Sequence, residues 1–157
     1  MRLIDIMSAD LVIADLASTT RDDVLQEMVE RIAVVRPEVE ASRAQRVLVE
    51  RERLGSTGVG DGLAIPHARL PALSTAVACF ARSRGGVDFG ALDGKPTDLF
   101  LALLAPAGHA GLHLKALARA ARLFKDAAFR GTLRDAPDAA TLWVALQAQD
   151  EALSLSP

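Results

Sequence analysis

Hydrophobic residues recur every three or four positions in the first third of the chain, which is the spacing of one helix face. Four of them form an apolar stripe: Leu25, Met28, Val29 and Ile32. Thr19 and Thr20 each stand three residues before an aspartate, and this arrangement fits a capping box at a helix start. The pattern therefore predicts a helix that begins after Thr20. Pro37 separates it from a second helix, expected from about Ala41 to Arg53.

Short continuous apolar runs predict buried strands further along the chain. Three such runs are present, at residues 63–65, 75–80 and 98–104. The first follows a glycine-rich segment, Gly55–Gly62, and precedes Pro66 and His67, so we expect a strand that ends just before His67. Gly85-Gly86 and Asp93-Gly94 predict turns between the later strands.

The last part of the chain is expected to be helical. A third helix is predicted from about Leu112 to Lys125, and Pro137 opens a final helix that continues through Leu146. Helices and strands alternate along the chain, although not as a strict βαβ repeat. This order predicts an α/β fold with α+β character, in which helices pack on a mixed sheet. The length of 157 residues corresponds to a single domain over residues 1–157.

Composition limits the classes of function. Half of the residues (50%) are hydrophobic, 24% are charged and the net charge is −2, so no overall basic field exists to attract nucleic acid or an anionic membrane. The N-terminus resembles neither a signal peptide nor a transmembrane segment, so we expect a cytoplasmic protein without membrane insertion. Cys79 is the only cysteine, which excludes an internal disulfide, and its apolar neighbours favour a small core residue over a nucleophile.

The chain has three histidines and no tyrosine, so histidine is the scarce residue for chemistry. His67 is expected where a strand passes into a loop, a common position for ligand sites in α/β sheets, although a surface or capping histidine has the same pattern. Arg51 follows Val47 by four residues and Leu48 by three, so it shares the inward face of the second helix. An arginine there forms a buried ion pair, reaches the rim with its charged end, or binds an anion.

His113 heads the apolar stripe of the third helix and is expected to face the sheet from the first helical turn. The positive end of the helix dipole disfavours an imidazolium there, so a neutral His113 can hydrogen-bond a phosphate or orient another imidazole. A histidine satisfied by a backbone carbonyl is the alternative.

His109 is expected in an exposed loop. Its spacing of four from His113 would suit a metal site, but the helix is expected to start too late to align the two side chains, and no nearby glutamate completes a metalloprotease motif.

The glycine-rich segment is not expected to bind a nucleotide. It lacks the Lys-Ser/Thr pair of a P-loop, and it precedes a strand, which is the reverse of the order in dinucleotide-binding folds. Its glycines let the backbone turn tightly near His67, and Thr57 can add a hydroxyl to that site. On the third helix, three residues form a basic stripe that is either a solvated face or a docking surface for a partner protein: Lys115, Arg119 and Arg122.

The segment from Glu50 to His67 closely resembles the active-site segment of enzyme IIA of the bacterial phosphotransferase system, in its fructose/mannitol/nitrogen-regulatory branch. Three later stretches are similar to the same family: residues 86–96, 103–106 and 113–115. The resemblance covers nearly the whole chain. It implies a mixed sheet of about five strands sandwiched by helices.

The same resemblance implies the chemistry of the site. His67 would be the phosphoacceptor, with Arg51 and His113 as the neighbouring active-site residues. The donor in this family is a phosphohistidine on HPr or its nitrogen-branch counterpart, so the transfer runs between two imidazoles without a metal, a nucleotide or another cofactor. The chain would then be a phosphocarrier, which is a component of a phosphotransferase rather than a conventional multiple-turnover enzyme.

Members of this family serve either transport or regulation. Sugar-transport members pass the phosphoryl group to a IIB protein, whereas nitrogen-regulatory members mainly bind regulatory target proteins according to their phosphorylation state. The sequence contains no fused IIB, IIC or HPr-like segment, and its N-terminal opening resembles the standalone nitrogen-regulatory members, so we expect a regulatory protein. Residues 107–111 depart from the family pattern because they contain an extra histidine and fewer acidic residues. They lie where the donor protein is expected to dock, at the rim of the active site.

Two alternatives of other classes remain open at the level of sequence. One is a metal-dependent hydrolase that uses the same histidines, and the other is a binding module without phosphotransfer. Neither Thr57 nor His109 receives a definite role from the sequence.

Overall fold

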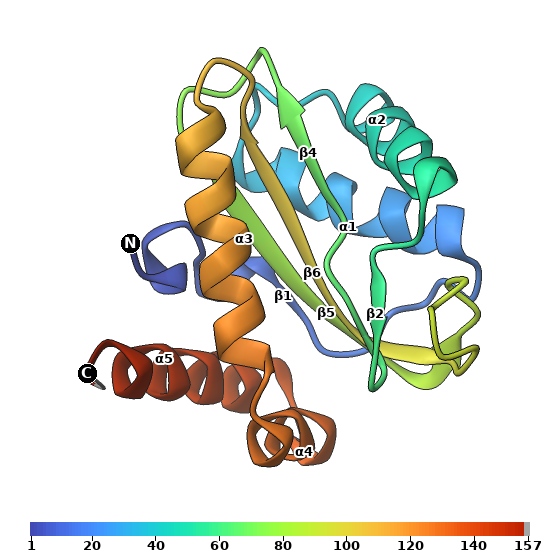
Figure 1. Cartoon of the computed structure of the whole chain (residues 1–157), viewed down its shortest axis with the longest axis vertical. Helices are drawn as coiled ribbons and strands as arrows, with labels where there is room; N and C mark the ends of the chain where they lie inside the picture. Colours follow the sequence, from blue (N-terminus) through green and yellow to red (C-terminus); the bar gives the residue numbers. More distant parts are fainter. Residues whose placement is uncertain (156–157) are drawn as a thin grey trace.

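The computed structural model describes residues 1–155 of the chain, as a central sheet with helices on both faces (Figure 1). Within these residues the strands are β1 (Val12–Ile13), β2 (Gly58–Gly60), β3 (Leu63–Ala64), β4 (His67–Leu70), β5 (Val77–Val87) and β6 (Thr97–Pro106). The α-helices of the same part of the chain are α1 (Arg21–Val35), α2 (Ala41–Leu54), α3 (Ala110–Phe124), α4 (Ala127–Asp135) and α5 (Ala139–Leu155). Two short 3-10 helices, Leu3–Asp5 and Ala9–Leu11, precede β1.

The sheet is mixed, which confirms the fold class predicted from the sequence. Its order is β1-β5-β6-β3-β2, and β4 also pairs with β6. The long strands β5 and β6 are antiparallel, whereas β1 runs parallel to β5, and both β3 and β4 run parallel to β6. The strands β3 and β4 therefore follow one another along the same edge of β6, with Leu63 opposite Leu99 and His67 opposite Leu103.

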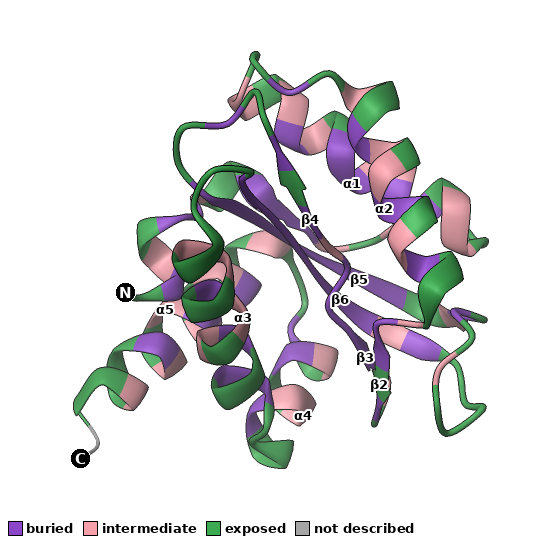
Figure 2. Ribbon diagram, turned by 45° about the horizontal axis from the view of Figure 1, so that its top comes forward, coloured by how far each residue is buried: buried purple, intermediate pink, exposed green. Residues whose placement is uncertain are grey.

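The two faces of the sheet carry separate hydrophobic cores. The helices α1 and α2 cover one face, and α3, α4 and α5 cover the other (Figure 1; Figure 2). Successive side chains of β6 point to opposite cores, with Phe100, Ala102 and Leu104 in the first and Leu99, Leu101 and Leu103 in the second. A strand that is buried on both faces has a continuous apolar sequence, which is why residues 98–104 could be recognised as a strand.

Several predicted features are confirmed. Thr20 is the N-cap of α1, and its side-chain oxygen accepts a hydrogen bond from the backbone N–H of Asp23 (3.3 Å). The second helix covers the expected residues and one more, Leu54. A turn is present at Asp93-Gly94. Cys79 is fully buried, and burial raises the pKa of its thiol to about 12, as fits a core residue.

The prediction of a turn at Gly85-Gly86 is wrong. The strand β5 continues through both glycines, and its pairing register with β6 shifts between Arg82 and Val87. Gly86 has a φ of 76°, which an L-amino acid with a side chain rarely adopts, so the glycine signals an irregularity inside a strand instead of its end.

The helical C-terminal third differs from the prediction in two places. The third helix begins at Ala110, two residues earlier than expected, and ends at Phe124. The helix α4 was not expected; it begins after Asp126, whose carboxylate accepts hydrogen bonds from the backbone N–H groups of Ala128 and Phe129. Among residues 1–155, a helix with the length and apolar character needed to span a bilayer is not found.

The strand before His67 is also shorter than expected, and a new strand begins at His67 itself. The strand β3 ends at Ala64, and β4 starts at His67, after Ile65 and Pro66. Pro66 has no N–H to offer a sheet, but its carbonyl accepts a hydrogen bond from the backbone N–H of Leu103 (2.8 Å). The interruption is therefore tied to β6, and His67 occupies a fixed position at the start of β4.

Candidate functional site

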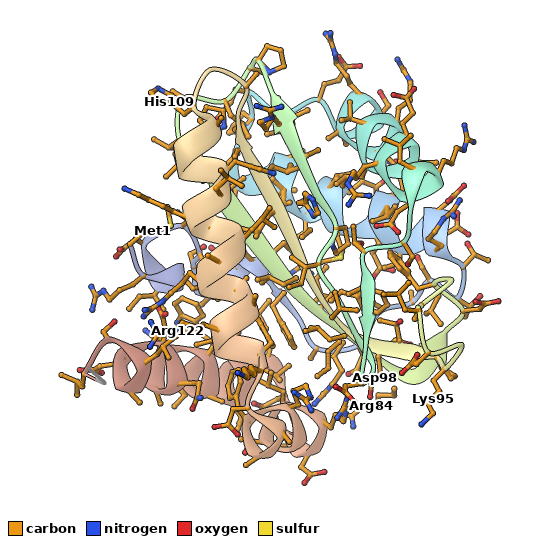
Figure 3. All side chains as sticks on the ribbon, viewed as in Figure 1. Met1, Arg84, Lys95, Asp98, His109 and Arg122 are labelled. Atoms are coloured by element: carbon orange, nitrogen blue, oxygen red, sulfur yellow. The ribbon has the colours of Figure 1, made fainter. Side chains whose placement is uncertain are left out.

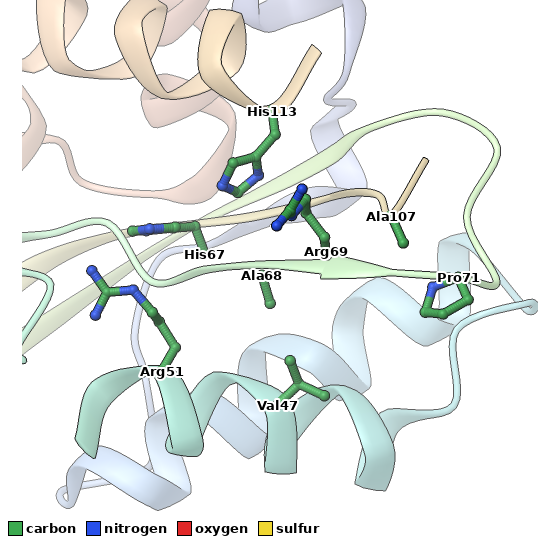
Figure 4. A pocket seen from close by; sticks show the side chains of 8 residues that line it. All are labelled: Val47, Arg51, His67, Ala68, Arg69, Pro71, Ala107 and His113. Atoms are coloured by element: carbon green, nitrogen blue, oxygen red, sulfur yellow. The ribbon is translucent and has the colours of Figure 1, made fainter. Parts of the chain in front are cut away.

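His67, Arg51 and His113, the three residues that the family resemblance assigned to the site, come together around one open pocket (Figure 4). The pocket has a volume of about 560 Å³ and lies between three elements. His67 comes from β4, Arg51 from the last turn of α2, and His113 from the first part of α3. Because these elements are far apart in the sequence, the grouping depends on the tertiary fold.

The imidazole of His67 is held in one orientation by the backbone. Its Nδ1 lies 2.8 Å from the carbonyl oxygen of Ile65, and since a carbonyl only accepts, Nδ1 carries the proton in this contact. In the neutral ring the other nitrogen, Nε2, then has a free lone pair. His67 is half-buried and lines the pocket, so the geometry suits a nucleophilic nitrogen with a fixed tautomer.

His113 faces His67 across the pocket. The two ring centroids lie 5.4 Å apart with the planes tilted by 50°. Burial lowers the pKa of His113, and the nearby His67 and Arg69 lower it further. A neutral His113 was predicted on the basis of the helix dipole; the direction is confirmed, but desolvation is the main cause. Its Nδ1 is buried without a hydrogen-bond partner in residues 1–155, so the predicted alternative of a histidine bound to a carbonyl through that nitrogen is not observed.

Arg51 lies on the pocket side of α2, as the helical phase predicted. Its guanidinium points toward the ring of His67 (Figure 4), and its Nη1 donates a hydrogen bond to the carbonyl of Gly55 (2.7 Å). No carboxylate in residues 1–155 forms an ion pair with it. Its charge is therefore available to an anion in the pocket.

Arg69 is a second pocket cation, and the sequence analysis missed it. It follows His67 by two residues in β4, and alternation along a strand puts both side chains on the same face, while Ala68 points the other way toward Val47 (Figure 4). The polar-apolar alternation of residues 67–70 was the available signal, but the strand was expected to end before His67. Within the described part of the chain no Asp or Glu lines this pocket, so the two arginines make it electropositive.

Two other candidates are not part of the pocket. His109 is exposed at the N-terminal end of α3, where it is the N-cap residue without a side-chain cap (Figure 3), and it does not line the pocket. Thr57 is buried and its hydroxyl binds Glu52, so it does not reach the pocket directly.

The basic stripe on α3 is not continuous. Arg119 turns inward, and its Nε donates to the carboxylate of Asp150 (2.8 Å), while Lys115 and Arg122 are exposed. Across residues 1–155, no three His, Cys, Asp or Glu side chains are grouped as the ligands of a metal ion would be. Nothing in the described part of the chain supports the metal-dependent hydrolase alternative.

Comparison with known proteins agrees with this geometry. The family model described as "Phosphoenolpyruvate-dependent sugar phosphotransferase system, EIIA 2" matches residues 5–149. A nitrogen regulatory protein of Bradyrhizobium diazoefficiens is 38% identical over 146 residues, which are 93% of this chain and 95% of that protein. A nitrogen regulatory protein of Pseudomonas aeruginosa is 36% identical over 143 residues, or 91% of this chain and 93% of that protein.

A solved structure is similar over the same range. The crystal structure of nitrogen regulatory protein IIA-Ntr from Neisseria meningitidis matches with a TM-score of 0.83 and 31% identity, covering 90% of this chain and 97% of that chain. The resemblance found in the sequence is thereby confirmed. The chain belongs to the EIIA 2 family of the phosphoenolpyruvate-dependent sugar phosphotransferase system and is a phosphocarrier protein of that system.

Proposed function

We propose that the chain takes a phosphoryl group onto Nε2 of His67 from the phosphohistidine of an HPr-like donor, and that it acts as a nitrogen-regulatory IIA protein. The observation that carries the proposal is the Nδ1 contact of His67 with Ile65, which leaves Nε2 free beside an electropositive pocket. The similarity to nitrogen regulatory proteins supports the proposed regulatory role. We further propose that residues 1–157 act as one EIIA domain in the cytoplasm.

The transfer is a displacement at phosphorus between two imidazoles. The lone pair on Nε2 of His67 forms the new N–P bond as the N–P bond of the donor breaks, and the bonding electrons return to the donor ring. No water is consumed. The ring of His67 gains positive charge as the bond forms, and the Ile65 carbonyl, already bound to the Nδ1 proton, stabilises that charge (2.8 Å).

Arg51 and Arg69 supply the charge that the moving group requires. A phosphoryl group passes through a loose transition state in which negative charge spreads over its three equatorial oxygens. Donors that are already in place before the reaction stabilise such a state without reorganisation. Two arginines that form no ion pair with a carboxylate of residues 1–155, and that line the same pocket as His67, fit this requirement.

His113 is proposed as a hydrogen-bond donor and orienting residue, not a second carrier. His113→Ala is expected to accept a phosphoryl group at His67 about tenfold more slowly, because one hydrogen bond to the charged transferring group is lost. His113→Gln keeps an N–H donor in nearly the same place and should recover part of the rate. Rapid-quench phosphorylation assays with the purified donor measure both rates.

A titration adds an independent readout for His113. A negatively charged phosphoryl group on His67 favours the protonated form of a neighbouring imidazole, so the lowered pKa of His113 should rise when His67 is phosphorylated. Nuclear magnetic resonance of the His113 ring follows this change. Phosphate found on His113 of the wild-type protein, or unchanged transfer rates in His113→Ala, would contradict the assigned role.

The regulatory half of the proposal predicts that target binding depends on phosphorylation. Phosphorylation adds a charge of roughly −1.5 to −2 to the pocket. We expect affinity for a regulatory target to change by about fivefold or more between the free and phosphorylated proteins, a typical coupling between two binding events. Calorimetric titration of one target with wild-type, His67→Ala and phosphorylated protein tests this. Equal affinities combined with rapid transfer to a sugar-specific IIB protein would favour transport instead.

A further inference from the structure

Glu52 is a buried carboxylate that the proposed mechanism does not use. It lies in the last turn of α2, directly after Arg51, and its side chain is 4% exposed. No Lys, Arg or His of residues 1–155 forms an ion pair with it. A buried charge without a cation must be satisfied by hydrogen bonds, because its desolvation is otherwise costly. The bonds that satisfy Glu52 therefore indicate what it does.

Both carboxylate oxygens of Glu52 bind Thr57. One accepts a hydrogen bond from the backbone N–H of Thr57 (3.0 Å), and the other accepts a hydrogen bond from its hydroxyl. Thr57 is itself only 5% exposed. The paired bonds fix both the position and the orientation of this residue relative to the end of α2, across Gly55 and Ser56.

Thr57 in turn binds the residue that holds the histidine. Its backbone carbonyl accepts a hydrogen bond from the N–H of Ile65 (3.1 Å), and the carbonyl of Ile65 accepts from Nδ1 of His67 (2.8 Å). The result is a continuous series of contacts from Glu52 through Thr57 and Ile65 to His67. Glu52 fixes Thr57, Thr57 holds Ile65, and Ile65 holds the ring of His67.

The direction of the Ile65 carbonyl has little freedom left. The backbone N–H of Ile65 is bound to the carbonyl of Thr57, and the following Pro66 restricts Ile65 to extended backbone. The Pro66 carbonyl is fixed in turn by the N–H of Leu103 (2.8 Å). Releasing Thr57 removes one of these three restraints, so the carbonyl that selects the tautomer of His67 gains freedom to move.

We infer that Glu52 is a positioning residue for His67: through Thr57 and Ile65 it aims the carbonyl that keeps the proton on Nδ1 and the lone pair on Nε2. Glu52 also adjoins Arg51, so a single helical turn sets the placement of both the cation and the nucleophile of the pocket. The inference rests on the proposed function of His67, but the tautomer can be measured without any phosphoryl donor.

Two substitutions at Glu52 separate positioning from charge. In Glu52→Gln the amide oxygen can accept from the Thr57 N–H while the amide nitrogen donates to the Thr57 hydroxyl oxygen, so the geometry is kept without the charge. Glu52→Met has a similar length and no hydrogen-bonding group. We expect Glu52→Met to lose the single Nδ1–H tautomer of His67 and to slow its phosphorylation by about tenfold or more, since small misplacements of reacting groups have effects of this size. Glu52→Gln should stay within about threefold of wild type.

The readouts are ¹⁵N chemical shifts of the His67 ring, which distinguish the tautomers, and the rate of phosphorylation from a phosphorylated donor. If Glu52→Met does not fold, the milder pair Thr57→Val and Thr57→Ser gives the same comparison, because only serine keeps the hydroxyl. An unchanged His67 tautomer in a folded Glu52→Met or Thr57→Val protein would overturn the inference. Failure of the wild-type protein to be phosphorylated at His67 would instead overturn the proposed function, and the tautomer measurement would still decide the role of Glu52.

Discussion

Replacing His67 with alanine is expected to abolish phosphorylation by an HPr-like donor. The side chain of His67 supplies the free Nε2 in the pocket, and His113, the only other histidine there, lies on the opposite wall with a lowered pKa. The fold should persist, because β4 pairs with β6 through the backbone and the observed hydrogen bond of the ring is to Ile65. Incubation with the phosphorylated donor, followed by mass spectrometry of the intact protein and its peptides, measures the label.

His109→Ala is the matched control. It also removes an imidazole, but from an exposed position outside the pocket, so its labelling should equal that of wild type. The linkage should be acid-labile, as expected of a phosphorus–nitrogen bond, and it should lie on Nε2 of the ring. Equal labelling of His67→Ala and wild type would show that another residue accepts the phosphoryl group.

The inward direction of two site residues could be predicted because it depends on regular helical structure. Arg51 lies on α2, and the helical period alone predicted its inward face, whereas Arg53, two residues later, is exposed. His113 was assigned to the inward side of α3 by the same argument. The start of that helix was placed too late because Gly108 and Gly111 favour a loop, yet Gly111 lies within α3. Packing of the helix on the sheet outweighs the weak helical propensity of one glycine.

The parts that were missed depend on contacts between distant segments. Pro66 was interpreted as the end of a strand. A proline only interrupts the hydrogen bonding of a strand at its own position, and β6 pairs with the chain both before and after Pro66. Arg69 was overlooked for this reason. The role of Glu52 cannot be read from the helical phase, because its partner Thr57 lies beyond the helix end and meets it through the turn at Gly55.

Arg51→Ala is expected to slow phosphorylation of His67 by roughly two to three orders of magnitude, the loss that accompanies removal of one preorganised donor from a transition state. Arg51 fits that role because its guanidinium points at the ring of His67, donates from Nη1 to the Gly55 carbonyl (2.7 Å), and lines a pocket to which residues 1–155 contribute no Asp or Glu. Single-turnover kinetics with a saturating phosphorylated donor isolates the chemical step from docking, and circular dichroism verifies the fold.

Comparison among three arginines makes this prediction specific. Arg53→Ala removes the same charge two residues later on α2, but from an exposed side chain outside the pocket, so its rate should stay within about twofold of wild type. Arg69→Ala should fall between the two, at about a tenfold loss, because Arg69 lines the pocket but is exposed, and water screens its charge. Equal losses in Arg51→Ala and Arg53→Ala would mean that arginine acts here through long-range attraction of the donor. That effect declines steeply with added salt, whereas stabilisation of the transition state inside the pocket does not, so repeating the series at high ionic strength distinguishes the two explanations.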